Sequence, residues 1–347
     1  MKTNAVLISK FLIFLFICSM LSHCGRQAAP DADFVFKQTH VIQLDSGGIS
    51  LSACVVNDRV YVLSGVDNGY FRIDMKSGEF SRGVFPVGFR QPTSITYSRN
   101  RIIVSDITDQ SLTFFDRDMR FKKRVVLNRF PLDARVHGNR CVYLTDLMQD
   151  QIYNFILVDE NILNRKERII FSGDTLNTTS LRESLNLDIP GTICFDYDGR
   201  HVFAARQRYD SYVIYRLRPD RDFVAEEFIR DREWSPIEYS ETEYLAARAV
   251  YSKILDESHY PLDQLVFSHK IAILSLAADI HGRLWVVSSG PGNSLSLNLY
   301  SPTGAKIRNM VFDGIDKAKI LVSATHFALL ETDTAHPRIF IYEMTKN

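Results

Sequence analysis

The feature that most constrains the fold of this chain is a degenerate repeat whose copies start about forty residues apart. Each copy contains an apolar strand, a polar turn, a second β-rich strand, another polar turn and an alternating apolar strand. The first turn ends in arginine in five copies: Arg59, Arg101, Arg140, Arg200 and Arg283. The second strands begin at Val60, Ile102, Val142, Val202, Leu284 and Phe327, at spacings of 42, 40, 60, 82 and 43 residues. The short spacings match one four-stranded blade of a β-propeller.

The two ends of the repeat array indicate how it closes. The sixth copy has only three strands before Asn347, whereas "FVFKQTHVIQL" (34–44) is a spare strand. That strand would complete the last blade, and closure would protect the sheet edges. We therefore expect an all-β fold over 34–347, a six-bladed β-propeller of four-stranded antiparallel blades. A two-sheet sandwich or two domains is the alternative, but neither explains the period, and no Pro/Gly/Ser-rich linker divides the chain.

The first residues of the chain differ from the repeats in composition. Lys2 and Lys10 are followed by "FLIFLFICSML" (11–21), an apolar run shorter than the about 20 residues that a membrane span needs. "LSHC" (21–24) resembles a bacterial lipobox, in which the cysteine is lipidated and becomes the mature N-terminus. His23 departs from the small residue expected at its position, and this puts cleavage efficiency in doubt.

The leader predicts where the protein is located. We expect a lipoprotein-type signal peptide over 1–24 with Cys24 as the lipidation site, followed by a tether over 25–33. The protein would then lie in the cell envelope, held to the membrane by its lipid and facing the periplasm or the cell surface. A plain signal peptide and an uncleaved anchor are the alternatives.

Composition argues against several classes of function. Lys+Arg and Asp+Glu are both 41, so no basic excess indicates a nucleic-acid partner. Cys54, Cys141 and Cys194 lie in apolar strand-like runs without zinc-ligand spacing, which predicts buried free thiols. We expect no cofactor, no metal and no catalytic residue of a recognisable motif.

The leader, the six repeats and units such as "VSDITDQSLTFFD" and "LTDLMQDQIYNF" together resemble bacterial six-bladed propeller lipoproteins of the TolB-like kind, and the units also resemble NHL repeats. The resemblance covers nearly the whole mature chain. It implies the architecture and an envelope location, but it does not imply one activity, because propellers host unrelated functions.

The two long spacings predict inserts between blades, at about 172–188 and about 230–264. Both would connect the outermost strand of one blade to the innermost strand of the next, so they would flank the fourth blade on one face. "SETE" (240–243) is a capping-box signal, and the apolar spacing that follows predicts an amphipathic helix of about 14 residues. The helix would either stabilise the rim or act as a lid or docking element.

Acidic residues recur in the polar turns, at Asp67, Asp106, Asp109, Asp146, Asp150, Asp210 and Glu331. Asp side chains commonly accept hydrogen bonds from their own turn, and a residue that recurs at equivalent positions in successive units serves the repeat more readily than a unique site. These acids are therefore predicted to cap turns rather than to bind calcium or catalyse. Candidate ligand- or partner-binding residues are basic and aromatic ones near the insert-bearing face: Arg90, Arg135, Arg206, Arg208, Trp234, Tyr239 and Tyr244.

These patterns favour a non-catalytic scaffold that binds an envelope protein or a small ligand through the face with the two inserts. A lactonase- or lyase-type enzyme that works at the channel mouth is one alternative. A module that binds glycan fragments is another.

Overall fold

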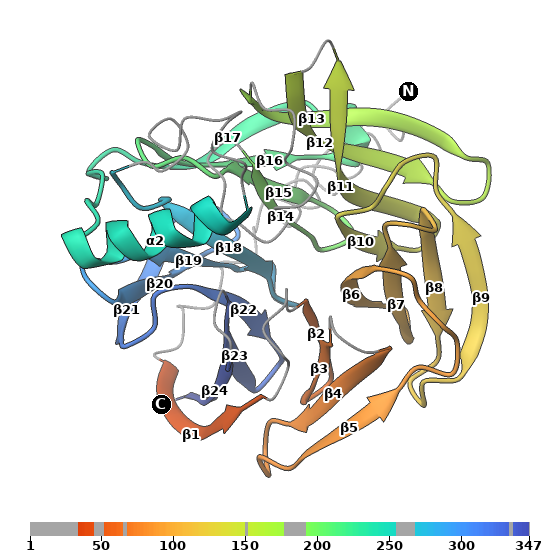
Figure 1. The fold of residues 1–347 in the computed structure, drawn as a ribbon, viewed down its shortest axis with the longest axis horizontal. Coiled ribbons are helices and arrows are strands. Elements are labelled where there is room, and N and C mark those ends of the chain that lie inside the picture. The colour runs from red at the N-terminus through yellow and green to blue at the C-terminus, as the bar shows by residue number, and fades with distance from the viewer. Residues whose placement is uncertain are drawn as a thin grey trace, which may run out of the picture. The chain divides into compact units, whose positions relative to one another are not determined.

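The computed structural model describes residues 34–44, 52–64, 68–149, 152–176, 192–254, 268–332 and 336–346. One compact unit spans Lys37–Met344. Its strands form six separate four-stranded antiparallel sheets, and the sheets of this unit surround a common axis (Figure 1). The predicted six-bladed β-propeller is confirmed.

Blades 1 to 5 each consist of four consecutive strands, ordered from the innermost to the outermost. Blade 1 contains β2 (Ala53–Val56), β3 (Arg59–Leu63), β4 (Gly69–Asp74) and β5 (Phe80–Val84). Blade 2 contains β6 (Pro92–Ser98), β7 (Arg101–Asp106), β8 (Ser111–Phe115) and β9 (Phe121–Val126). Blade 3 contains β10 (Asp133–His137), β11 (Arg140–Gln149), β12 (Ile152–Asn161) and β13 (Lys166–Leu176). Blade 4 contains β14 (Ile193–Tyr197), β15 (Val202–Arg206), β16 (Tyr212–Leu217) and β17 (Ala225–Asp231). Blade 5 contains β18 (Ile273–Ala278), β19 (Leu284–Ser289), β20 (Ser294–Tyr300) and β21 (Lys306–Asp313).

Blade 6 is closed by the N-terminal strand, as the sequence predicts. It combines β22 (Ala318–Val322), β23 (His326–Glu331) and β24 (Arg338–Lys346) with β1 (Phe34–Gln43) as its outermost strand. The Leu44 amide donates to the Pro337 carbonyl at 2.8 Å, and the Tyr342 hydroxyl lies 3.1 Å from the Gln38 amide oxygen. The first blade is thereby tied to the last.

Apolar side chains hold neighbouring blades together. One cluster of buried residues joins blade 1, through Tyr61 and Phe85, to blade 2, through Ile95 and Phe115. Corresponding clusters join blade 6 to blade 1, blade 2 to blade 3, blade 3 to blade 4 and blade 4 to blade 5. The core therefore lies between the sheets.

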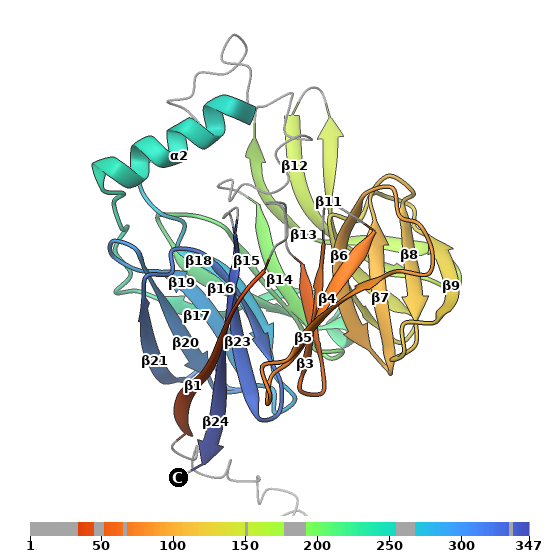
Figure 2. The ribbon, with the colours of Figure 1, turned by 60° about the horizontal axis from the view of Figure 1, so that its bottom comes forward.

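The unit has two faces with different connections. Because successive strands run antiparallel, the turns between the first and second strands lie on the same face as the turns between the third and fourth. We call this the turn face. The loops between the second and third strands and the connections between blades lie on the other face, which we call the insert face. Helix α2 (Glu241–Ile254) and the far ends of β11 and β12 both project on the insert face (Figure 2).

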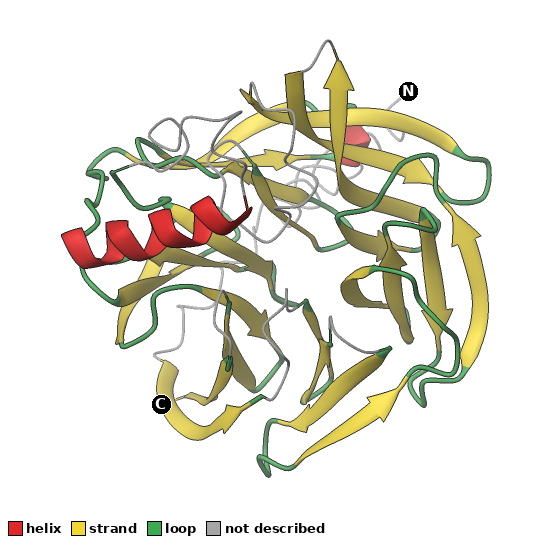
Figure 3. Cartoon of the chain, in the orientation of Figure 1, coloured by secondary structure: helices red, strands yellow, loops and turns green. Residues whose placement is uncertain are grey.

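Helix α2 is the one α-helix among the described residues, whose regular structure is otherwise nearly all strand (Figure 3). Its capping box forms as predicted: the Ser240 amide donates to Glu243 Oε2 at 2.8 Å, and the Glu243 amide donates to Ser240 Oγ at 3.3 Å. A short 3₁₀-helix, η2 (Pro219–Arg221), precedes β17. No described helix is long and apolar enough to cross a membrane.

Blade 3 departs from the sequence-based expectation. Strands β11 and β12 have ten residues each, and the ladder pairs Asp146 with Phe155. The prediction that Asp146 lies in a turn is therefore wrong, because the strand continues past it. Residues 172–176 of the first expected insert continue strand β13, while 177–188 lie outside the described residues, as do Asp67, Asp150, Cys24, the leader and the tether.

Cys54, Cys141 and Cys194 are not joined in disulfides; Cys54 and Cys141 are buried, and Cys194 is half-buried. Burial raises the pKa of Cys54 to about 12. This thiol therefore stays protonated and behaves as a small apolar side chain.

Candidate functional site

The most strongly built site on the insert face is centred on a buried lysine beneath helix α2. The Lys270 side chain is only 2% exposed, and it lies between α2 and β18. Its ammonium donates to Glu243 Oε1 at 2.6 Å and to the Gly292 carbonyl at 2.5 Å, and it lies 3.4 Å from Asp316 Oδ1. The Lys270 ammonium therefore contacts three separate connections: helix α2, the β19–β20 loop and the segment between β21 and β22.

Glu243 belongs both to the capping box and to this cluster. Burial acts to raise the pKa of its carboxyl, but the hydrogen bonds from Lys270 and from Ser240 lower the pKa overall. The side chain is therefore a carboxylate at neutral pH. A buried ammonium without a partner would be costly, so the pair fixes the start of α2 over blade 5. We call Lys270, Glu243, Gly292 and Asp316 the lysine lock.

Aromatic side chains surround the base of α2. The Trp234 indole N–H donates to the Tyr209 carbonyl at 3.2 Å, and its ring lies 5.6 Å from the Tyr212 ring. Tyr209 stacks on His269 at 5.6 Å, and the Lys270 ammonium lies 5.7 Å from the centre of the Tyr239 ring. Trp234 and Tyr239 are half-buried, so they anchor the insert as well as contributing to its surface.

The outward side of α2 is different in character. Residues Glu241, Thr242, Leu245, Ala246 and Ala249 are exposed and recur at helical spacing. Leu245 is 55% exposed, and Tyr244, at the side of the helix, is half-buried. A small apolar strip therefore faces solvent on an element that the lysine lock holds in place.

The predicted arginines do not form one site. The Arg206 guanidinium lies 4.8 Å from the Phe171 ring and 5.5 Å from the Tyr215 ring, and its Nε donates to the Ser172 carbonyl at 3.0 Å. Arg208 is exposed on the loop after β15. Arg90 is exposed beside blade 2, with its Nε 3.4 Å from Asp109 Oδ1. These side chains stand in three different surroundings.

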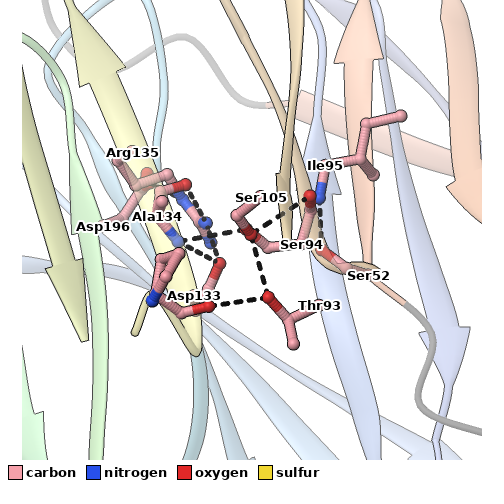
Figure 4. Close-up of polar contacts among 10 residues, drawn as sticks. Ser52, Thr93, Ser94, Ile95, Ser105, Asp133, Ala134, Arg135 and Asp196 are labelled. Carbon is pink, nitrogen blue, oxygen red and sulfur yellow. Dashed lines mark hydrogen bonds and ion pairs between the residues drawn. The ribbon is translucent and has the colours of Figure 1, made fainter. Parts of the chain in front are cut away.

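The fourth predicted arginine, Arg135, lies on the innermost strands instead. Its Nη1 donates to Asp133 Oδ1 at 2.6 Å and its Nε donates to Asp196 Oδ1 at 3.0 Å, with the Phe195 ring 5.4 Å away (Figure 4). Sequence reasoning does not find Asp133 and Asp196. Their only signal is the single acids in "PLDAR" and "TICFDY", which become adjacent when β10 and β14 pack together.

Burial and charge compete in this Asp–Arg–Asp cluster. Burial acts to lower the pKa of Arg135, but the two neighbouring carboxylates raise the pKa overall. Burial raises the pKa of Asp196, and the Arg135 charge opposes that rise. One guanidinium therefore faces two carboxyl groups, and both acids already accept hydrogen bonds from the protein.

The remaining polar groups of the inner wall join one blade to the next. Innermost-strand amides donate to side chains of the preceding blade: Ile95 to Ser52 Oγ at 3.1 Å, Ala134 to Ser94 Oγ at 3.1 Å, Ala278 to Asp196 Oδ2 at 2.8 Å and Ile320 to Ser275 Oγ at 3.2 Å. Ser105 and Thr93 extend the hydrogen bonds around Ser94 (Figure 4). These groups serve the architecture.

Asp106 has the role that the repeat predicts. Its Oδ1 accepts from the Asp109 amide at 3.0 Å, and its Oδ2 accepts from the amides of Arg90 at 2.7 Å and Gln91 at 3.2 Å. The carboxylate caps its own turn and fixes the connection from blade 1. Within the described ranges, no three His, Cys, Asp or Glu side chains are grouped so that they could hold a metal ion.

Comparison with known proteins supports the fold and no specific activity. No protein-family model and no curated protein matches the sequence. Among solved structures, a member of the DUF4221 family from Bacteroides vulgatus is similar, with a TM-score of 0.51, 9% identity, and coverage of 92% of this chain and 100% of that one. A gluconolactonase from Xanthomonas campestris has a TM-score of 0.52 and 10% identity, with coverage of 92% of this chain and 99% of that one. The calcium-binding protein regucalcin from Agrobacterium tumefaciens has a TM-score of 0.50 and 10% identity, with coverage of 87% of this chain and 93% of that one. At such low identity these likenesses concern architecture, not activity.

Proposed function

We propose that this protein is a non-catalytic binding scaffold of the bacterial cell envelope, lipid-anchored at Cys24 and related in kind to TolB-like propeller lipoproteins. It holds a protein partner through the insert face. The observation that carries the proposal is the lysine lock, which positions α2 with Leu245, Ala246 and Ala249 toward solvent. Binding residues are commonly carried on such loops over a rigid scaffold.

The inner wall supports a scaffold over a lactonase-type enzyme. Propeller folds accommodate enzymes, and one of the similar structures is a gluconolactonase. In this chain, however, Asp133 and Asp196 are paired with Arg135, and Asp196 also accepts the Ala278 amide. A carboxylate that acts as a general base or metal ligand needs free lone pairs, whereas both oxygens of Asp196 and Oδ1 of Asp133 already accept hydrogen bonds within the inner wall.

Affinity capture from envelope extract tests the partner proposal. Leu245→Arg places a charge in the exposed strip of α2 without touching the lysine lock, so we expect it to abolish recovery of the partner that the wild type captures. Val126→Arg is the matched control, because Val126 on β9 is 52% exposed and belongs to blade 2, across the propeller from α2 (Figure 1). Equal recovery by wild type and both variants would exclude α2 as the binding element.

The anchor is tested separately. Cys24→Ala should release the protein from the membrane fraction, because it removes the lipidated side chain. Retention of this variant in the membrane fraction would refute lipidation at Cys24 without bearing on α2.

A further inference from the structure

Four acids of the turn face, Asp74, Asp116, Asp198 and Asp279, are occupied by their own turns, whereas Glu79, Asp118 and Asp220 are exposed. Asp74 Oδ1 accepts from the amides of Lys76 and Ser77, at 3.0 and 3.1 Å. Asp116 Oδ1 accepts from the amides of Asp118 and Arg120, both at 3.0 Å. Asp198 Oδ1 accepts from the amides of Arg200 and His201, both at 2.6 Å, and Asp279 Oδ1 accepts from the His281 amide at 2.8 Å. The carboxylates of these four acids therefore bond to backbone amides of their own turns.

Four arginines of the same face extend outward, whereas Arg283 is buried against Asp279. Arg99, Arg101, Arg120 and Arg200 are exposed, and within the described part of the chain none of them forms an ion pair. Lys76 and Lys122 do pair with acids, at 2.7 Å from Asp58 and 2.6 Å from Asp116. Although the chain is neutral as a whole, its turn face thus presents unpaired cations.

Large apolar side chains are exposed on this face as well. Ile280 in a turn of blade 5 is 78% exposed, Leu163 in a turn of blade 3 is 67% exposed, and Val224 after η2 in blade 4 is 61% exposed. Each lies at a turn rather than on a strand, so each is carried at the extremity of its blade.

The turns of neighbouring blades touch, so the cations and the apolar tips share one surface. The Arg99 guanidinium lies against Gly138 of the next blade, and the His137 ring lies against Gly199. Across the closure, the hydroxyls of Ser323 and Thr325 donate to Asp58 Oδ1 at 3.1 and 2.8 Å.

We propose that the turn face rests on a phospholipid surface with anionic headgroups. Exposed arginines are attracted to such a surface, and apolar tips gain by entering the headgroup region. This contact leaves the insert face, with α2, directed away from the bilayer.

The path of the chain fits this orientation. Leu44, directly after β1, donates its amide to the carbonyl of Pro337, which lies in the β23–β24 loop of the insert face. His40 Nε2 lies 3.1 Å from the carbonyl of Lys76, which lies in the β4–β5 turn of the turn face. Strand β1 therefore enters the propeller from the turn face. Lys37 is thirteen positions after Cys24, a reach of at most about 45 Å. This reach supports the orientation only together with the proposed lipid anchor. The exposed arginines and apolar tips support it independently of that anchor.

Vesicle co-sedimentation tests the contact with the full chain as Cys24→Ala, so that no lipid is attached. We expect binding to phosphatidylethanolamine vesicles that contain phosphatidylglycerol, weakened by added salt. Replacing Arg99, Arg101 and Arg200 with Gln should reduce the binding constant about fivefold for each arginine removed. Arg208→Gln on the insert face is the control and should change binding less than twofold. Every variant carries the same leader, so differences report on the faces.

The outcomes are distinguishable from those of the proposed function. Equal binding to phosphatidylcholine vesicles, or equal losses from Arg208→Gln and from a turn-face arginine variant, would overturn the proposed contact. Ile280→Glu should also weaken binding, and an unchanged affinity would refute insertion of the apolar tip. Mass spectrometry of the wild-type chain from the envelope reports lipidation at Cys24 independently of the vesicle result.

Discussion

The lysine lock of the insert face and the acid-capped turns of the turn face use their charged side chains in opposite ways. On the insert face, Lys270 is buried and reaches three connections that are distant in sequence. On the turn face, acids such as Asp116 and Asp198 bond to amides two to four residues away, and four arginines (Arg99, Arg101, Arg120 and Arg200) remain exposed to solvent. A repeated turn stabilises itself locally, whereas an inserted helix needs a long-range ion pair to hold it. The turn face is therefore free to vary its outward side chains.

The largest effect is expected when the lysine lock is broken. Glu243→Gln removes the negative charge of the closest partner of the buried Lys270 ammonium and leaves Asp316 as its remaining carboxylate contact, so we expect a loss of about 3 kcal/mol in the interaction that holds α2. Hydrogen exchange of the α2 amides measures this loss directly. The control is Glu241→Gln, an exposed acid on the same helix, expected to change stability by less than about 0.5 kcal/mol. Similar exchange in the two variants would show that the lock does not hold the helix.

A smaller effect is expected at Asp159, an acid of the turn face that does not cap a turn. For comparison, Asp116 does cap its turn, and hydrogen bonds from Lys122 and from backbone amides lower its pKa to about 2. Burial instead raises the pKa of Asp159 to about 6, although Arg140 Nη1 donates to its Oδ2 at 2.8 Å. Between pH 4 and 6 the folded chain therefore binds a proton at Asp159 more tightly than the unfolded chain does.

The sign of the pH dependence follows from linkage. The contribution of Asp159 to the free energy of unfolding should fall by an amount on the order of 2 kcal/mol as pH rises through this window. Denaturant unfolding of wild type and Asp159→Asn at several pH values measures the difference between them. A difference that stays constant from pH 4 to pH 7 would contradict a raised pKa at this site.

The smallest effect is expected at the helix cap. Ser240→Ala removes the acceptor of the Glu243 amide but leaves the lysine lock, so it should cost about 1 kcal/mol. Thermal or denaturant unfolding, together with exchange at the first turn of α2, measures this change. A loss as large as that of Glu243→Gln would mean that the cap, rather than the lock, positions α2.

Much of the fold can be predicted from the sequence because its causes are local or periodic. The spacing of the strand starts predicts six blades, the spare strand at 34–44 predicts the closure, and "SETE" predicts the start of α2. The acidic segment "DLMQD" is misleading at Asp146, because an acid within a continuing strand looks the same as an acid in a turn.

The candidate site depends on contacts that no local pattern contains. Arg135 meets Asp196 across 61 residues, and Lys270 meets Glu243 across 27 and Asp316 across 46. The sequence favours Arg135 as a ligand-binding residue, but the structure shows its guanidinium paired within the inner wall. Such pairings require knowing which strands pack together, and the repeat alone does not specify them.

One measurement addresses the division between the faces most directly: hydrogen exchange of the full chain, free and bound to vesicles that contain phosphatidylglycerol. We predict slower exchange in turns of the turn face, such as 99–101, 199–201 and 279–283, with exchange in α2 (241–254) unchanged. Protection of α2 together with unchanged exchange in those turns would contradict the assignment of the two faces.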